Sequence, residues 1–330
     1  MQARFTGVRG AIALLAIVLV SCTQGTTPTA RISPSPPSPS SSCRLPISLV
    51  LDLKGDLQGA FVDFPGGKVT VDPSGAGGAS YSRRFKRWLP VAPNAISTDG
   101  TRYAFLEAWG GFDQQGRLHV VDLATGNDRV YKIGVAGTGG QLPFVVLSFV
   151  PEGIWLTNGG YEGPGGGLFL LDLGTGALKE TRLPGDAHIT EPVAGGPGTF
   201  WFTDPGPNPE LAAIGFPIPE RVEQLMVPDG KSAIWFTKPG SYVRVLGTDI
   251  AGHPIVGAWV NGGDSLDESV WVVSSPATAK EISTGHDAFQ PIADSHGLWF
   301  GSSKGIYHYS DATGMERITD QNANPAGTCS

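Results

Sequence analysis

One segment indicates most directly how this 330-residue chain folds: Gly297-Leu-Trp-Phe-Gly-Ser-Ser-Lys-Gly-Ile-Tyr-His-Tyr-Ser-Asp-Ala-Thr-Gly-Met-Glu-Arg-Ile318. It holds an aromatic strand, a short turn, a second apolar strand, an Asp-x-x-Thr-Gly turn and the start of a third strand. In such a turn the aspartate bonds to its own backbone and the glycine supplies a positive φ. The stretch therefore predicts short antiparallel strands joined by tight turns.

The same pattern recurs along the chain. Further aromatic strands are expected at Gly153–Thr157, Thr199–Thr203, Ala233–Thr237 and Ser269–Val273, with weaker copies at Ala60–Phe64 and Tyr103–Leu106. Four antiparallel strands fit in each repeat, and one such sheet cannot cover both of its faces, so neighbouring sheets must stack. A closed ring of such sheets is a β-propeller. The sequence predicts an all-β fold with a single propeller of seven four-stranded blades over residues 43–330, six or eight blades being the alternatives.

Composition excludes several classes of protein. The 47 glycines and 27 prolines are spread along the chain and forbid the long helices of bundles and doubly wound folds. Lysine and arginine number 23 against 30 aspartate and glutamate, a net charge of −7. A charge-poor acidic chain has no electrostatic footprint for a phosphate backbone, so we expect no nucleic-acid partner.

The N-terminal residues predict export and a lipid anchor. Arg4 and Arg9 precede a ten-residue apolar run, Ala11–Val20, which as a helix would span about 15 Å, half of a ~30 Å hydrocarbon core. Such a run is typical of a signal peptide, here residues 1–21, rather than of a membrane span. Leu19-Val20-Ser21-Cys22 resembles the bacterial lipobox, which implies lipidation of Cys22 and an extracytoplasmic place on a bacterial membrane; a secretory leader with a chance cysteine is the alternative. Residues 22–42 form a Pro/Ser/Thr-rich linker after the lipidated cysteine.

The repeats also resemble known families. Gly297–Ile318 is similar to the two-component-regulator propeller repeat, and the strands ending in Trp-Leu-Thr or Trp-Phe-Thr resemble repeats of virginiamycin B lyase. Ile96–Phe105 is similar to the WD40-like repeats of periplasmic propellers. These resemblances imply the propeller fold, and because one propeller scaffold hosts many activities they imply no particular function.

Two cysteines remain for the folded body, Cys43 and Cys329, at its two extremes. A closed ring brings its ends together, and an oxidising compartment lets a bridge persist, so we expect a disulfide between them, with two free thiols as the alternative. Ile47–Asp52 is the strand expected to complete the last blade.

Three histidines precede what reads as the same proline-led strand of three blades: His188, His253 and His286. Residues that enter the innermost strands line one mouth of the channel, where carboxylates are also expected from Glu191, Asp287 or Asp294. Imidazole and carboxylate together could bind a divalent metal or exchange protons with a substrate. The resemblance to virginiamycin B lyase implies acid/base residues and magnesium at this place, although its pattern does not map onto these residues one by one. The alternative is loop histidines without a shared task.

The dense basic run Arg83-Arg-Phe-Lys-Arg-Trp88 is expected either to dock an anionic polymer, such as teichoic acid or lipid headgroups, or to be a solvated loop. No nucleotide-binding or hydrolase motif is present. We therefore predict a membrane-anchored, monomeric lipoprotein without a cofactor, which binds a protein, glycan or small molecule. A metal-assisted lyase or hydrolase with its site at the channel mouth is the alternative.

Overall fold

The computed structural model describes residues 42–52, 55–107, 116–134, 144–158, 167–181, 190–204, 219–260, 268–283 and 288–330. The chain divides into two units, Met1–Ser40 and Ser41–Ser330, and all described residues belong to the second. The predicted signal peptide, Cys22 and the predicted linker up to residue 41 therefore lie outside the described residues. Within the described part, no helix is long and apolar enough to cross a membrane, and the one helical segment is a 3-10 turn, Pro93–Ala95.

Three sheets have the four antiparallel strands of a propeller blade, numbered from the innermost strand outward. The first contains β9 (Val145–Val150), β10 (Gly153–Thr157), β11 (Leu168–Leu171) and β12 (Leu178–Thr181). The second contains β13 (Thr190–Gly196), β14 (Thr199–Asp204), β15 (Arg221–Met226) and β16 (Lys231–Thr237). The third contains β17 (Ser241–Thr248), β18 (Pro254–Val260), β19 (Ser269–Ser275) and β20 (Thr278–Ser283).

The remaining strands form one small sheet, one hairpin and one double sheet. The small sheet is β6 (Arg102–Leu106), β7 (Gly116–Asp122) and β8 (Asp128–Ile133), with Ile96 bridged to Tyr103 where an innermost strand would lie. The hairpin is β4 (Ser80–Ser82) with β5 (Arg87–Leu89). The double sheet joins β21 (Phe289–Asp294), β22 (Gly297–Ser302), β23 (Gly305–Ser310) and β24 (Gly314–Thr319) to β25 (Ala323–Pro325), β1 (Cys43–Val50), β2 (Leu57–Phe64) and β3 (Val69–Ala76).

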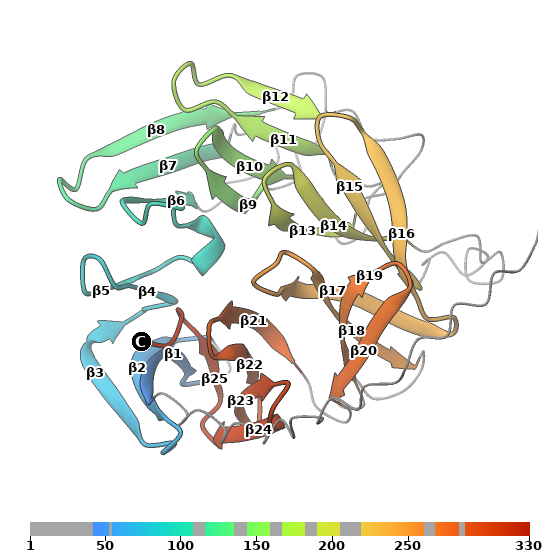
Figure 1. Cartoon of the computed structure of the whole chain (residues 1–330). Helices are drawn as coiled ribbons and strands as arrows, with labels where there is room; N and C mark the ends of the chain where they lie inside the picture. The colour runs from blue at the N-terminus through green and yellow to red at the C-terminus, as the bar shows by residue number, and fades with distance from the viewer. Residues whose placement is uncertain are drawn as a thin grey trace, which may run out of the picture. The chain divides into compact units, whose positions relative to one another are not determined.

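Within residues 41–330 these sheets follow one another around a common centre (Figure 1). The innermost strands contact one another in chain order, β6 with β9, β9 with β13, β13 with β17, β17 with β21, and β21 with β25. Apolar side chains fill the space between neighbouring sheets; for example, Trp155 of β10 packs edge-on against Phe200 of β14 with ring centroids 4.9 Å apart. The predicted all-β propeller is confirmed.

The predicted aromatic strands are all strands, but one was assigned to the wrong sheet. Trp201 lies on β14 and Trp235 on β16, in the second and fourth strands of the same sheet, with their rings 4.7 Å apart. They were expected to mark two successive blades, and that assignment is wrong. The total of seven blades stays a prediction.

The ring closes through the C-terminal strand. β25 pairs with β1 on one side and, through Ser302 and Ala323, with β22 on the other, so it joins the two halves of the double sheet. The strand β1 was expected to complete the last blade itself; instead it pairs with β2 and β25. The predicted disulfide is confirmed, with the Cα atoms of Cys43 and Cys329 5.6 Å apart.

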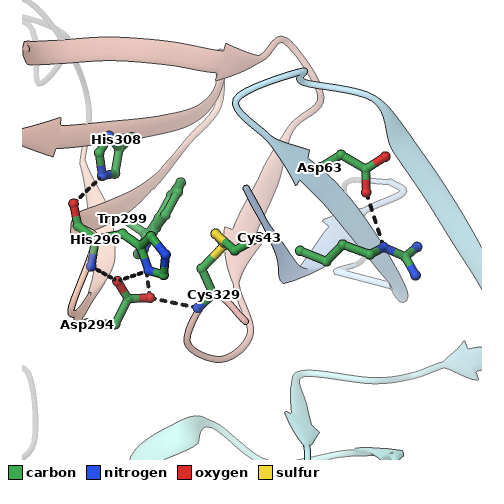
Figure 2. Close-up of a disulfide and its surroundings, with 8 residues drawn as sticks. Cys43, Asp63, Asp294, His296, Trp299, His308 and Cys329 are labelled. Atoms are coloured by element: carbon green, nitrogen blue, oxygen red, sulfur yellow. Dashed lines mark hydrogen bonds and ion pairs between the residues drawn. A yellow bond between two sulfur atoms is a disulfide. The ribbon is translucent and has the colours of Figure 1, made fainter. Parts of the chain in front are cut away.

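A buried carboxylate holds the same junction (Figure 2). Asp294, the last residue of β21, accepts hydrogen bonds at Oδ2 from the Cys329 backbone N–H at 2.7 Å and from Nε1 of Trp299 at 2.9 Å. Its Oδ1 accepts from the backbone N–H of His296 at 2.8 Å. The three donors compensate the loss of water around this carboxylate. Asp294 thus ties the C-terminal segment to the last innermost strand.

Replacing Cys329 with serine should lower the melting temperature without abolishing the β circular dichroism signal, because the sheets still stack while the closure loses its covalent link. A native disulfide typically contributes about 2–5 kcal/mol. The control is Cys22→Ser, which lies outside the folded unit. An unchanged melting temperature for Cys329→Ser would contradict a stabilising role for the bridge.

Candidate functional site

The two faces of the propeller differ in the length of their connections. The innermost strands β9, β13, β17 and β21 end in short turns, residues 151–152, 197–198, 249–253 and 295–296. We call the side with these turns the hairpin face. On the opposite side, the loop face, the links from second to third strands and between sheets are longer, for example residues 158–167, 205–220 and 261–268. Binding residues concentrate on longer connections held by a rigid scaffold, so the loop face is the candidate functional face.

Four exposed apolar side chains lie at the loop-face ends of the strands, while Met226 and Ile250 are exposed on the hairpin face. Val145 at the start of β9 is 50% exposed, Val260 at the end of β18 is 67% exposed, and Phe289 at the start of β21 is 38% exposed. Leu51, directly after β1, is 61% exposed. Single exposed apolar residues are ordinary on a protein surface, so Val260 and Phe289 bear on function only because they lie beside or within the group described next.

Five residues on this face form a connected group that we call the aromatic–arginine cluster: Tyr242, Arg244, Trp259, Glu268 and Phe289. Tyr242 and Arg244 project from the same side of β17, two residues apart, and Trp259 is paired opposite Tyr242 on β18. Phe289 begins β21 of the next sheet, and Glu268 directly precedes β19. The cluster therefore lies between two neighbouring sheets.

An ion pair fixes the centre of the cluster. Nε and Nη2 of Arg244 donate to the two carboxylate oxygens of Glu268, both at 2.9 Å, in the bidentate arrangement that suits arginine. Glu268 is 1% exposed and also accepts from the backbone N–H of Ala288 at 3.2 Å. Space for its carboxylate exists because residue 257 is glycine; a methyl group there would overlap Oε1 of Glu268. The guanidinium is thus held in one place, and its charge is balanced.

Aromatic rings flank the guanidinium. Trp259 and Phe289 place their ring centroids 5.3 Å and 5.7 Å from the Arg244 Cζ, and Tyr242 stacks on Trp259 with centroids 4.3 Å apart. Among the described residues, the hydrogen bonds of Arg244 use Nε and Nη2 and leave Nη1 to other acceptors. Tyrosine, tryptophan and arginine are the residues that most often carry the binding energy of protein interfaces. The cluster offers a rigid aromatic surface with a fixed hydrogen-bond donor, Nη1 of Arg244.

A second loop-face group contains a carboxyl of altered acidity. Glu223 on β15 lies beside Arg221, whose Nε is 3.2 Å from its Oε1, and Asp204 at the end of β14 accepts from the same Nε at 3.0 Å. Burial raises the pKa of Glu223 above its ordinary value, and the hydrogen bond with the Asp204 carboxyl raises it further, while Arg221 opposes both. This pair can hold a proton between its two carboxyl groups.

The predicted histidine site is placed only in part. His188, His286 and Asp287 lie outside the described residues, and so does the side chain of Glu191, whose backbone belongs to β13. His253 lies in the hairpin-face turn before β18, where its Nδ1 is 3.0 Å from Oδ2 of Asp249. Since β18 is the second strand of its sheet, whereas β13 and β21 are innermost strands, His253 does not precede an equivalent strand, and that premise of the prediction is wrong. The carboxylate of Asp294 is engaged by the closure described above.

Two histidines within strands have local partners. His119 on β7 lies 2.7 Å from Asp128 and stacks on Phe105, and His308 on β23 is buried beside Trp299, so both pack within their sheets. The basic run forms the β4–β5 hairpin, whose arginine and lysine side chains are exposed. Within the described ranges, no group of three or more His, Cys, Asp or Glu side chains could hold a metal ion.

Comparison with known proteins bears on the fold alone. No family model matches the chain, and no curated protein matches it. Among solved structures, the chain is similar to a prolyl endopeptidase (10% identity, TM-score 0.48, covering 66% of this chain and 34% of that one). It is also similar to TolB from Acinetobacter baumannii (12% identity, TM-score 0.43, covering 79% of this chain and 61% of that one). A third similar structure is the β-propeller domain of the Trilobed protease from Pyrococcus furiosus (12% identity, TM-score 0.48, covering 84% of this chain and 81% of that one). The chain thus spans about a third of the first of these proteins and less than two thirds of the second.

Replacing Glu223 with glutamine should make stability less dependent on pH. A carboxyl whose pKa is raised on folding contributes stability that is fully present below its unfolded value, near 4.5, and is lost as the pH rises through the folded value. The variant should therefore gain melting temperature relative to the natural chain as the pH rises from acid to neutral. Glu180→Gln, an exposed change on β12, is the control. Parallel pH profiles for the natural chain and Glu223→Gln would contradict the raised pKa.

Proposed function

We propose that the chain is a binding module of the bacterial cell surface, anchored by lipid at Cys22, which holds a protein partner on the loop face of its propeller. The aromatic–arginine cluster is the observation that carries this proposal. It combines a preorganised guanidinium, three aromatic rings and an exposed apolar rim on the face with the longer connections.

The chemistry of the cluster favours a protein surface over an anion. Because Glu268 balances the charge of Arg244, the cluster offers no net positive charge to a phosphate or carboxylate. Ring faces and a fixed donor instead suit the apolar side chains and backbone carbonyls that a protein presents. Prepositioned side chains also lose little conformational entropy on binding.

The place of the folded unit in the cell is proposed from the N-terminal sequence. Residues 1–21 read as a signal peptide and Leu19–Cys22 as a lipobox, and the disulfide agrees with an oxidising compartment. Cys43, the first residue of β1, lies beside Cys329 near the hairpin-face end of β21. The loop face is therefore on the side of the ring away from the first folded residue.

The enzyme alternative rests on residues outside the described ranges. His188, His286 and Asp287 were expected to supply the acid, base or metal ligands of a lyase or hydrolase, and His253 belongs to the other face. Binding is therefore the function that the described residues support best.

Phe289→Ser should weaken partner binding more than tenfold, because truncating an aromatic interface residue at a central position typically costs about 2 kcal/mol or more. The measurement is quantitative recovery of co-isolated proteins from native membranes with the tagged full chain. Val130→Ser is the matched control, since Val130 is 48% exposed on the outer strand β8, away from the loop face. Equal recovery with both variants would contradict the proposal.

Cys22→Ser should move the protein from the detergent phase to the aqueous phase on phase separation, because the acyl chains of a lipidated cysteine supply about 0.8 kcal/mol for each buried methylene. The natural chain should partition into detergent. Recovery of the natural chain wholly in the aqueous phase would contradict the lipid anchor at Cys22. The Phe289→Ser measurement tests partner binding on the loop face independently of this result.

A further inference from the structure

The basic run Arg83–Trp88 has no part in the proposed binding face, but the structure gives it a defined place. It contains the turn of the β4–β5 hairpin, residues 83–86. Phe85, at the centre of the turn, packs against the buried cluster that contains Leu89. Nη1 of Arg84 donates to the backbone carbonyl of Asp99 at 3.1 Å. These contacts hold the turn against the body of the propeller.

The turn lies on the hairpin face, beside the closure of the ring (Figure 1). On β4, the backbone N–H of Tyr81 donates to the carbonyl of Ala326 at 2.8 Å, directly after β25. Burial lowers the pKa of Arg83, and the charge of Asp294, at the hairpin-face end of β21, opposes that shift. The turn is therefore on the side of the ring where Cys43 begins the folded unit.

Four exposed cations define what we call the basic turn: Arg83, Arg84, Lys86 and Arg87. In the described part of the chain none of the four takes part in an ion pair. Two carboxylates are close to the turn, and both are bonded elsewhere. Asp294 is held by the closure, and Asp99 accepts from the hydroxyls of Ser97 and Thr101 at 2.6 Å and 2.7 Å. Four cations against two carboxylates leave the turn with a net positive charge.

The backbone of Lys86 indicates that its charge has a use outside the fold. Lys86 has a φ of 49°, in the left-handed region that favours glycine. Its side chain is exposed. Glycine would adopt this conformation with less strain, so the fold itself gives no reason for a lysine here. A strained residue that the packing does not require is evidence of a functional role.

We propose that the basic turn docks on the anionic phospholipid headgroups of the membrane that holds the chain. Arginine pairs with phosphate through two parallel hydrogen bonds, and lysine acts as a point charge. Each lysine or arginine at an anionic membrane surface raises binding roughly fivefold. The chain as a whole is acidic, with 23 lysines and arginines against 30 aspartates and glutamates. Because salt screens charges beyond about 8–10 Å, the attraction depends on the residues nearest the surface.

The tether favours a lipid surface over a soluble polymer. This step rests on the lipid anchor proposed at Cys22. Cys22 and Cys43 are 21 positions apart in the sequence, and a chain of that length reaches at most about 70–75 Å. Headgroups are therefore always within reach, which raises their effective concentration at the turn. Docking through the hairpin face leaves the aromatic–arginine cluster on the loop face uncovered.

Chemical labelling of lysine amines on vesicles tests the proposal with the natural mature chain. The vesicles consist of phosphatidylcholine alone or mixed with the anionic lipid phosphatidylglycerol, and only chain that floats with them is scored. Lys86 should react at least about fivefold less on the anionic vesicles, and high salt should restore its reactivity. Lys132 and Lys304, exposed at loop-face ends of their sheets, should react equally on both.

Two sets of variants separate charge from fold. Arg84→Gln with Arg87→Gln should remove most of the protection of Lys86, whereas the matched double change Lys132→Gln with Lys304→Gln should leave it intact. Lys86→Gly should keep or raise the melting temperature, because glycine relieves the left-handed backbone. A lower melting temperature for Lys86→Gly would contradict the inference that the fold does not need this lysine.

Four results would overturn the proposal. They are equal reactivity of Lys86 on both kinds of vesicle, protection that survives the loss of both arginines, equal protection of Lys132 and Lys304, and protection by soluble poly(glycerol phosphate) on neutral vesicles, which would assign the turn to a wall polymer. Failure of the natural chain to float with neutral vesicles would instead refute the anchor, and the docking with it. Phe289→Ser should leave the protection of Lys86 unchanged, so failure of the loop-face binding is recognised separately.

Discussion

Closure of the ring is the constraint on which the rest of this structure depends. Each sheet buries its faces only against its neighbours, so an open ring would leave two sheets half covered. The chain meets this need with its last residues: β25 bridges β1 and β22, the disulfide links Cys43 to Cys329, and Asp294 holds the Cys329 backbone N–H. Strand pairing, a covalent bond and a buried carboxylate therefore act at one junction, where residues separated by 286 positions meet.

The sequence was sufficient for the strands and for the ring, because aromatic strands and Asp-x-x-Thr-Gly turns are local signals. In the turn at Asp122, for example, the carboxylate accepts from the backbone N–H of Thr125 at 2.8 Å, which lowers the pKa of Asp122, and Gly126 has a φ of 74°. The disulfide also followed, since a ring must bring its ends together. What the signals could not give was the position of each strand within its sheet. The sequences around Trp201 and Trp235 are similar, yet Trp201 lies on a second strand and Trp235 on an outermost strand. The sequence does not distinguish the two positions, because each offers the ring an apolar neighbour on one face.

The same ambiguity explains the histidines. A proline-led strand after a histidine looks alike in sequence whether it is the first or the second strand of a sheet, and only the pairing of β18 with β17 and β19 places His253 on the hairpin face. The aromatic–arginine cluster was missed for a different reason. Its members come from four segments, and no spacing in the chain predicts that Arg244 meets Glu268. One signal was present: Tyr242, Arg244 and Leu246 alternate with Ser241, Val243 and Val245, and an arginine at the centre of such a strand requires a carboxylate nearby.

A propeller also separates its surfaces by role. The innermost strands and the sheet faces are buried by packing between neighbouring sheets. Residues at the two mouths and along the outer edges can therefore vary more freely. On one mouth this chain uses short turns and the closure, so substitutions there act on stability. The other mouth carries the longer connections and the cluster held by Glu268, where side chains can change without disturbing the stacking of the sheets. The outer edges must resist unwanted pairing, and the described outermost strands do so with charge or proline, with Lys231 serving on β16.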